Sequence, residues 1–251
     1  MGISTHKMVK QEALEVDILA IGAHPDDVEL SCSGTLLAHK AKGYRFGILD
    51  LTRGELGTRG TVEIRRNEAF EAAQILDAEF RLMLDMKDGF FENNQAHILP
   101  IVKVIRACRP KIILCNALSD RHPDHGRAAS LVKDACFYAG LRKVETLLGD
   151  QIQEAWRPDS IYFYIQDQIS KPDLVVETNA YMDQKIKSIE AFSSQFYNKN
   201  STEPESPISS KDFLDFVRAR DKVMGRFIAV EYAEGFHVSR PIGIKDLFEV
   251  V

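Results

Sequence analysis

The sequence predicts an α/β domain with a Rossmann-like, mainly parallel sheet and helices on both faces. Two observations support this fold class. Short apolar, β-rich runs alternate four times with helical patterns in the first 140 residues, which is typical of parallel strands joined by right-handed crossovers. The chain has 251 residues, of which 45% are hydrophobic and 27% charged, and this balance suits one domain spanning residues 1–251.

Each element of the first half has its own local signal. The first helix is expected to end at Gly43, a good helix stop, and apolar residues from Ala69 to Leu76 form one stripe of the second. Proline is tolerated in the first turn of a helix, so Pro100 places the start of the third at Leu99. The expected strands are 17–23, 44–51, 80–84 and 111–117, and the expected helices are 28–42, 61–76, 99–108 and 126–140.

The second half is less regular. Strands are expected at 160–165 and 174–177, and helices at 181–192 and 211–223. Residues 198–210 are rich in Ser, Asn, Pro and Glu and are expected to form an exposed, mobile loop. Residues 1–15 are polar and are interpreted as an N-terminal extension, not a signal peptide.

Charge and cysteine usage exclude several classes of protein. The net charge is -5 and the basic residues are scattered, which argues against a nucleic-acid partner. No apolar run approaches the roughly 18 residues of a membrane span. The four cysteines form no C-x-x-C pair, so they are interpreted as buried, reduced thiols of a cytoplasmic protein.

Two similar clusters follow expected strands. His24-Pro25-Asp26-Asp27 follows the first strand, and His122-Pro123-Asp124-His125 follows the fourth. A single His-Pro-Asp is commonly just a turn. In the common strand order 3-2-1-4, however, the first and fourth strands are neighbours, and ligands bind beyond their carboxyl ends. We therefore expect the clusters to meet there.

Together the clusters offer ligands for a catalytic metal. Two imidazoles and one carboxylate, with water in the fourth position, suit zinc, and the same set suits non-haem iron. The remaining histidines have no such context. His6, His39 and His97 are expected on the solvated surface or in a satisfied hydrogen bond, and the role of His237 stays open.

These residues resemble those of the zinc-dependent N-acetylglucosamine deacetylases of the PIG-L, or LmbE-like, family. The resemblance includes the two clusters and the segment 60–69, and extends to Glu234-Gly235-Phe236 and Arg240-Pro241-Ile242-Gly243, which are similar to the bacillithiol-biosynthesis branch. It implies His24, Asp27 and His125 as ligands of one zinc ion per chain. It also implies a homo-oligomer.

The resemblance further implies the roles of the neighbouring residues. Asp26 would be the general base, His122 would stabilise the oxyanion, and Asp124 would hydrogen-bond His122 and hold its charged form. Arg65 and Arg121 would contact the substrate. The segment Ser194–Tyr197 lies where the family places a mobile lid, with no role assigned to its individual residues.

The residues alone leave part of this open. Arg65 heads the apolar stripe of the second helix and needs a partner, but Arg66 has a similar relation to the stripe, and a structural ion pair is an alternative. Arg121 adjoins an expected ligand, and this position favours a role in function over a structural one.

The expected function is zinc-dependent removal of the N-acetyl group from a small-molecule sugar conjugate, N-acetylglucosaminyl malate in particular. Arg65, Arg121 and Arg240 are the cations expected to hold the malate. The alternatives are deacetylation of another N-acetylglucosamine or mycothiol-type conjugate, and a sugar- or nucleotide-binding module with a structural metal. The first βα turn carries His-Pro-Asp-Asp in place of G-x-G-x-x-G, which argues against dinucleotide binding.

Overall fold

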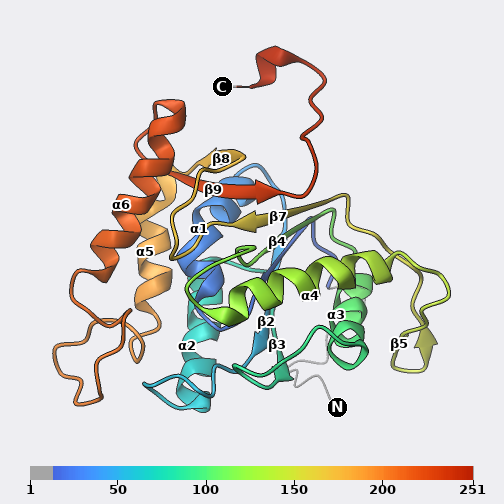
Figure 1. The fold of residues 1–251 in the computed structure, drawn as a ribbon, viewed down its shortest axis with the longest axis horizontal. Coiled ribbons are helices and arrows are strands. Elements are labelled where there is room, and N and C mark those ends of the chain that lie inside the picture. The colour runs from blue at the N-terminus through green and yellow to red at the C-terminus, as the bar shows by residue number, and fades with distance from the viewer. Residues whose placement is uncertain (1–13, 251) are drawn as a thin grey trace.

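The computed structural model describes residues 14–250 as an α/β domain around one seven-stranded sheet (Figure 1). The strands of this sheet are β1 (Ile18–Gly22), β2 (Phe46–Thr52), β3 (Arg81–Met86), β4 (Ile112–Cys115), β7 (Ser160–Tyr164), β8 (Leu174–Glu177) and β9 (Ala233–Val238). Their order is β3-β2-β1-β4-β7-β9-β8, which confirms the expected 3-2-1-4 arrangement. The first five strands in this order pair in parallel with one another, whereas β9 runs antiparallel to β7 and β8.

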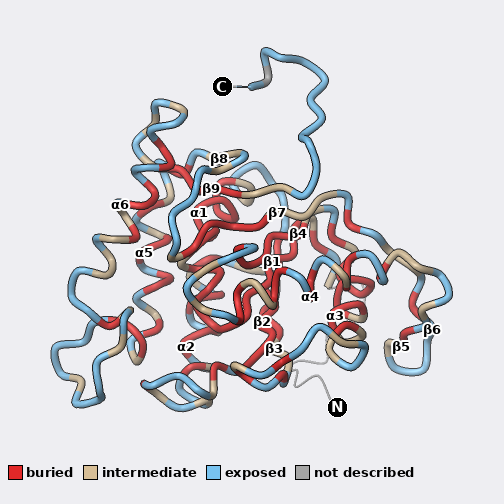
Figure 2. The backbone as a smooth tube through the Cα atoms, in the orientation of Figure 1, coloured by how far each residue is buried: buried red, intermediate tan, exposed pale blue. Residues whose placement is uncertain are grey.

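Helices cover both faces of the sheet, as expected. They are α1 (Asp27–Lys40), α2 (Val62–Ile75), α3 (Gln95–Cys108), α4 (Pro123–Ala139), α5 (Met182–Glu190) and α6 (Phe213–Gly225). Successive residues of a strand point to opposite faces, so Leu19 and Ile21 pack in the core that α3 and α4 cover, whereas Ile18 and Ala20 pack against α1. The buried parts of the chain lie along the strands and the inner sides of these helices (Figure 2).

The structure differs from the expected elements in one helix start and contains two features that the sequence did not predict. The segment Ala233–Val238 forms β9 inside the sheet, although its Glu and Gly residues break the apolar pattern of a strand. Helix α3 begins at Gln95, because the Asn94 side chain caps it by accepting a hydrogen bond from the His97 amide, and Pro100 lies inside the helix. A short hairpin of β5 (Leu147–Leu148) and β6 (Gln151–Ile152) was not expected at all.

Most of the segment 198–210 is exposed, as expected, but it also contributes Ser206, Pro207 and Ile208 to the wall of a cavity. The expected extension 1–15 lies almost entirely outside the described residues. All four cysteines are buried and free. Among residues 14–250, no helix combines the length and the apolar character that a membrane span requires.

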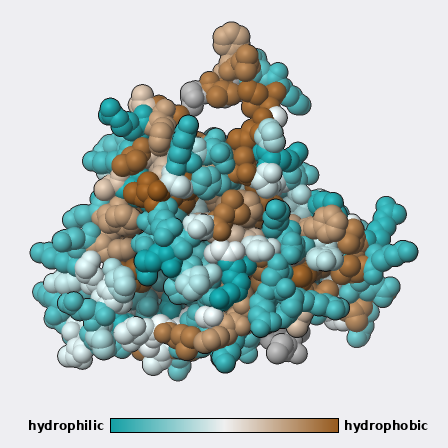
Figure 3. Space-filling model, in the orientation of Figure 1, coloured by the Kyte–Doolittle hydropathy of each residue, from teal (hydrophilic) through white to brown (hydrophobic). Residues whose placement is uncertain are grey.

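The C-terminal segment projects from the body beyond β9 and carries hydrophobic side chains into solvent (Figure 3). Leu247 is 80% exposed and Phe248 is 96% exposed. This segment lies away from the carboxyl ends of β1 and β4, where the histidine clusters are found.

Candidate active site

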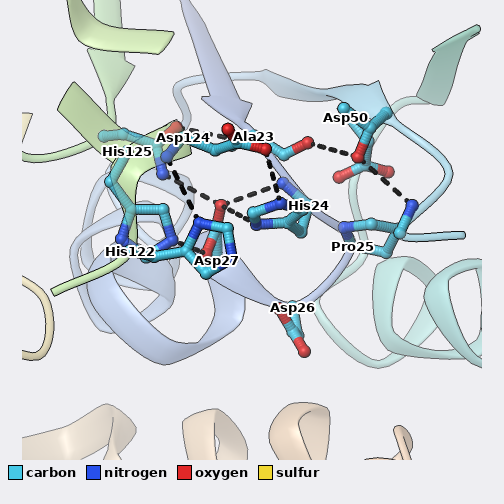
Figure 4. Close-up of polar contacts among 12 residues, drawn as sticks. Ala23, His24, Pro25, Asp26, Asp27, Asp50, His122, Asp124 and His125 are labelled. Carbon is cyan, nitrogen blue, oxygen red and sulfur yellow. Dashed lines mark hydrogen bonds and ion pairs between the residues drawn. The ribbon is translucent and has the colours of Figure 1, made fainter. Parts of the chain in front are cut away.

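The two His-Pro-Asp clusters meet beyond the carboxyl ends of β1 and β4, as the topology predicted. Strand β1 ends at Gly22 just before His24, and His122 caps the N-terminus of α4. The ring centroids of His24 and His122 lie 4.6 Å apart, and those of His122 and His125 lie 5.2 Å apart. Figure 4 shows the three rings side by side. Both clusters line one cavity.

His24 and His125 both direct one ring nitrogen at the Asp27 carboxylate. His24 Nδ1 lies 3.6 Å from Asp27 Oδ2, and His125 Nε2 lies 3.2 Å from Asp27 Oδ1. The opposite nitrogens are held by other carboxylates: His24 Nε2 lies 3.0 Å from Asp88 Oδ1, and His125 Nδ1 lies 2.6 Å from Asp120 Oδ2. A metal-binding histidine has this arrangement, with one nitrogen on the ion and the other on an orienting carboxylate.

The electrostatics of the three residues favour a cation between them. Burial opposes a charge on His24 and His125, but the surrounding carboxylates raise the pKa of His24 well above its usual range and that of His125 to about 9. Burial alone would raise the pKa of Asp27, yet the two histidines lower it well below its usual range. The field that favours protons on these rings also favours a metal ion. His24 and His125 form, with His122, a group whose donor atoms lie close enough together to hold one.

Asp26 is separated from this set although it adjoins Asp27 in sequence. Its backbone adopts φ 112°, a left-handed conformation, and its side chain points away from the Asp27 group (Figure 4). Its charged partner is Arg65, whose Nη2 lies 3.4 Å from Asp26 Oδ2. Burial raises the pKa of Asp26 to about 7, and Arg65 offsets only part of this shift. A carboxyl group with such a pKa can both accept and release a proton near neutral pH.

The structure does not give Asp124 the expected hydrogen bond to His122. Its carboxylate instead lies 3.3 Å from His24 Nε2, accepts from the Gly89 amide and pairs with Arg127. The Asp124 backbone amide donates to His122 Nδ1 over 3.2 Å. This geometry follows from the start of α4, where His122 is the capping residue and its side chain must face the first free amides.

The expectation of a charged His122 is therefore not supported. Burial lowers the pKa of His122, and the neighbouring charges of His24 and His125 lower it further. Because Nδ1 accepts a hydrogen bond, the neutral ring carries its proton on Nε2. His122 can thus donate from Nε2 into the site without being charged.

The predicted arginines differ in their positions. Arg65 is buried in the cavity wall and donates to the carbonyls of Gly54 and Pro25 as well as facing Asp26. Arg121 lies in the cavity wall, half-exposed, and pairs with Asp167 at 2.7 Å. Arg240 lies elsewhere, in a second cavity, and donates to the Asp159 carbonyl.

The other open residues also have definite places. In the segment 194–197, Ser194 bonds Glu68, and Gln195 lies in the wall of the site cavity. His237 bonds Ser170 and Asp173 outside that cavity. His39 and His97 each bond a backbone carbonyl, as expected, and His6 lies outside the described residues.

Four polar residues that hold the cluster were not predicted from the sequence. Besides Asp88 and Asp120, these are Asn116 and Gln166, which donate to the two Asp27 carboxylate oxygens over 2.9 and 3.1 Å. Their positions in the sequence could have indicated this role. Asn116 directly follows β4, and Gln166 directly follows the strand expected at 160–165, at the edge of the sheet where the clusters lie. Asp88 and Asp120 lie in loops and had no comparable pattern.

Known proteins resemble this chain in fold and in sequence. A solved structure from Thermus thermophilus, called conserved protein TT1542, is 35% identical, with a TM-score of 0.81 over 92% of this chain and 98% of that one. Residues 19–136, which include both clusters, match the family model described as PIG-L: GlcNAc-PI de-N-acetylase. The protein belongs to the PIG-L family.

Two curated relatives of this chain are deacetylases by name. An uncharacterized deacetylase, YaiS, of Escherichia coli K12 is 29% identical over 55% of this chain and 75% of its own length. A probable N-acetyl-alpha-D-glucosaminyl L-malate deacetylase 2 of Bacillus anthracis is 25% identical over 74% of this chain and 84% of its own length. Deacetylases of this kind hydrolyse amides, and the protein is accordingly a hydrolytic enzyme.

Proposed function

We propose that the protein removes the N-acetyl group from an N-acetylglucosamine conjugate, with one zinc ion held by His24, Asp27 and His125. One observation carries this proposal. Two imidazole nitrogens converge on a buried carboxylate while their opposite nitrogens are held by Asp88 and Asp120. Family membership supplies the class of substrate.

Zinc bound at these residues would supply Lewis acidity, which polarises an amide carbonyl and lowers the pKa of a coordinated water towards about 7. The chain itself supplies the proton transfers. Asp26, which is not among the proposed ligands and has a pKa of about 7, accepts a proton from the attacking water. It then returns the proton to the departing amine.

His122 and Arg65 have supporting roles in this proposal. The Nε2–H of a neutral His122 points a donor at the negative charge that develops on the former carbonyl oxygen. Arg65 fixes the turn that carries Asp26 by binding the Pro25 carbonyl, and its charge keeps the pKa of Asp26 from rising further. Removal of one oxyanion donor typically lowers turnover by about 10² to 10³.

The narrower proposal is that the conjugate is N-acetylglucosaminyl malate. Malate is a dicarboxylate, and four arginines line the cavity that holds the clusters: Arg59, Arg65, Arg121 and Arg220. The Bacillus anthracis relative, whose name specifies this substrate, matches over 74% of the chain. Arg240 lies in a separate cavity and has no part in this proposal.

The test is release of acetate and of a free amine from N-acetylglucosaminyl malate and from free N-acetylglucosamine. A higher kcat/KM for the malate conjugate supports the narrower proposal, because binding of the remote malate helps to position the acetamide. Equal values would contradict the malate assignment and leave the deacetylase standing. No release from either compound by zinc-loaded protein would contradict the deacetylase and favour a binding module.

A further inference from the structure

Among the arginines of the site cavity, Arg59 differs in how its charge is balanced. Arg65, Arg121 and Arg220 each have a carboxylate within 3.4 Å. Arg59 is only 5% exposed, yet its nearest carboxylate oxygen is 3.8 Å from Nε. Within residues 14–250, this buried Nε has no hydrogen-bond partner; Arg65 Nε has none either, but the Arg65 charge is balanced by Asp26 at 3.4 Å. A buried guanidinium with an unused donor is costly, and an anion bound to it relieves that cost.

The carboxylate near Arg59 belongs to Glu203, on the exposed loop 198–210. Both oxygens of Glu203 accept from the backbone amide of Gly60, at 3.0 and 3.2 Å. The Glu203 side chain is 43% exposed, so it can leave without opening the core. A removable carboxylate therefore lies against an amide and a buried guanidinium, in the position of an anionic ligand.

The position of Arg59 relative to the reaction centre is fixed by the loop that carries it, residues 53–61 between β2 and α2. Leu56 of this loop donates its amide to Asp88, which holds His24. Arg65, which faces Asp26, donates to the Gly54 carbonyl in the same loop. Arg59 and the histidines thus line one cavity, and hydrogen bonds connect the loop of Arg59 to the groups that hold His24 and Asp26.

We propose that Arg59 and the Gly60 amide form a subsite for a carboxylate of the substrate's aglycone, which displaces Glu203 when it binds. This inference rests on the proposed deacetylase function and deepens it by naming the group that reads the acidic part of the conjugate. Guanidinium and amide donors together give a carboxylate charge-assisted hydrogen bonds with a defined orientation.

The test compares kcat/KM for N-acetylglucosaminyl malate with that for the neutral methyl glycoside of N-acetylglucosamine. Arg59→Gln is expected to lower the malate-to-methyl ratio by about 10- to 100-fold, the effect of losing a charge-assisted contact. Arg240→Gln is the matched control, because Arg240 lies in a separate cavity, and it is expected to leave the ratio unchanged. The affinity of wild type, Arg59→Gln and Arg240→Gln for glucosaminyl malate, measured by calorimetry, tests the same contact without turnover.

Glu203→Gln tests the displacement and guards against misfolding of the Arg59 variant. It removes the competing charge from an exposed loop, so the ratio of KM values, malate conjugate over methyl glycoside, is expected to fall about 3- to 10-fold by loss of this competition. If the wild-type enzyme prefers the malate conjugate, the subsite alone would be overturned by two unchanged values: the kcat/KM ratio in Arg59→Gln and the KM ratio in Glu203→Gln. A wild-type enzyme inactive on both compounds would instead overturn the proposed function.

Discussion

Asp120→Asn should weaken metal binding without touching any proposed ligand. Asp120 Oδ2 lies 2.6 Å from His125 Nδ1, and its other carboxylate oxygen accepts from the Gln168 amide over 2.7 Å. The substitution keeps the size of the side chain but removes the charge that orients His125 and strengthens its basicity. Loss of such an orienting carboxylate typically lowers metal affinity by about 10- to 100-fold, or about 1.4 to 2.7 kcal/mol.

The assay is competition for zinc between the protein and a chelating indicator, with circular dichroism to verify the fold. Asp167→Asn is the matched control, because Asp167 pairs with Arg121 in the same cavity and contacts none of the three ligands among the described residues. Its zinc affinity should stay within about two-fold of wild type. Equal zinc affinity in wild type and Asp120→Asn would refute the assignment of His125 Nε2 as the atom that binds the metal.

The remaining predictions concern a ligand, the base and the core. His125→Ala should lose most of its zinc and keep its fold, and full metal occupancy by mass spectrometry would contradict the ligand set. Asp26→Asn should keep its metal and lose about 10² to 10⁴ in kcat, since its amide cannot accept the proton, and wild-type turnover would remove Asp26 from the mechanism. Lys185→Met should lower the free energy of unfolding in urea by about 3 to 5 kcal/mol, because it leaves the buried Glu234 carboxylate without a cation and Asp221 with Arg220 alone. Lys222→Met, at an exposed ion pair, should change the free energy of unfolding by less than about 1 kcal/mol. Equal changes in the two variants would contradict the role of Lys185 as the cation of a buried ion pair.

The sequence predicted the sheet and the meeting of the clusters because both depend on local patterns and general topology. Strand order follows from the alternation of elements, and the switch point then brings residues about a hundred positions apart together. The start of α3 was missed because the cap at Asn94 outweighed the cost of Pro100 inside the helix. Strand β9 was missed because its place depends on pairing with β7 and β8, not on its own pattern.

The details of the site were less predictable than its position. The partners of Asp124 depend on where its side chain points at the first turn of α4, and this places it on His24, not His122. Asp88 and Asp120 reach the histidines from loops, whose course is set by tertiary contacts. Arg59 carries no sequence signal that separates it from its neighbours, because its distinction is the pairing of a buried guanidinium with a distant carboxylate on an exposed loop.

The central claim, metal-dependent amide hydrolysis at His24, Asp27 and His125, is tested most directly by metal removal and restoration. Acetate release from N-acetylglucosaminyl malate is measured for protein stripped with a chelator and then titrated with zinc. We expect the stripped protein to be inactive and its activity to return in full at one zinc ion per chain. Full activity in the stripped protein, or no recovery at any zinc concentration while the fold is intact, would contradict it.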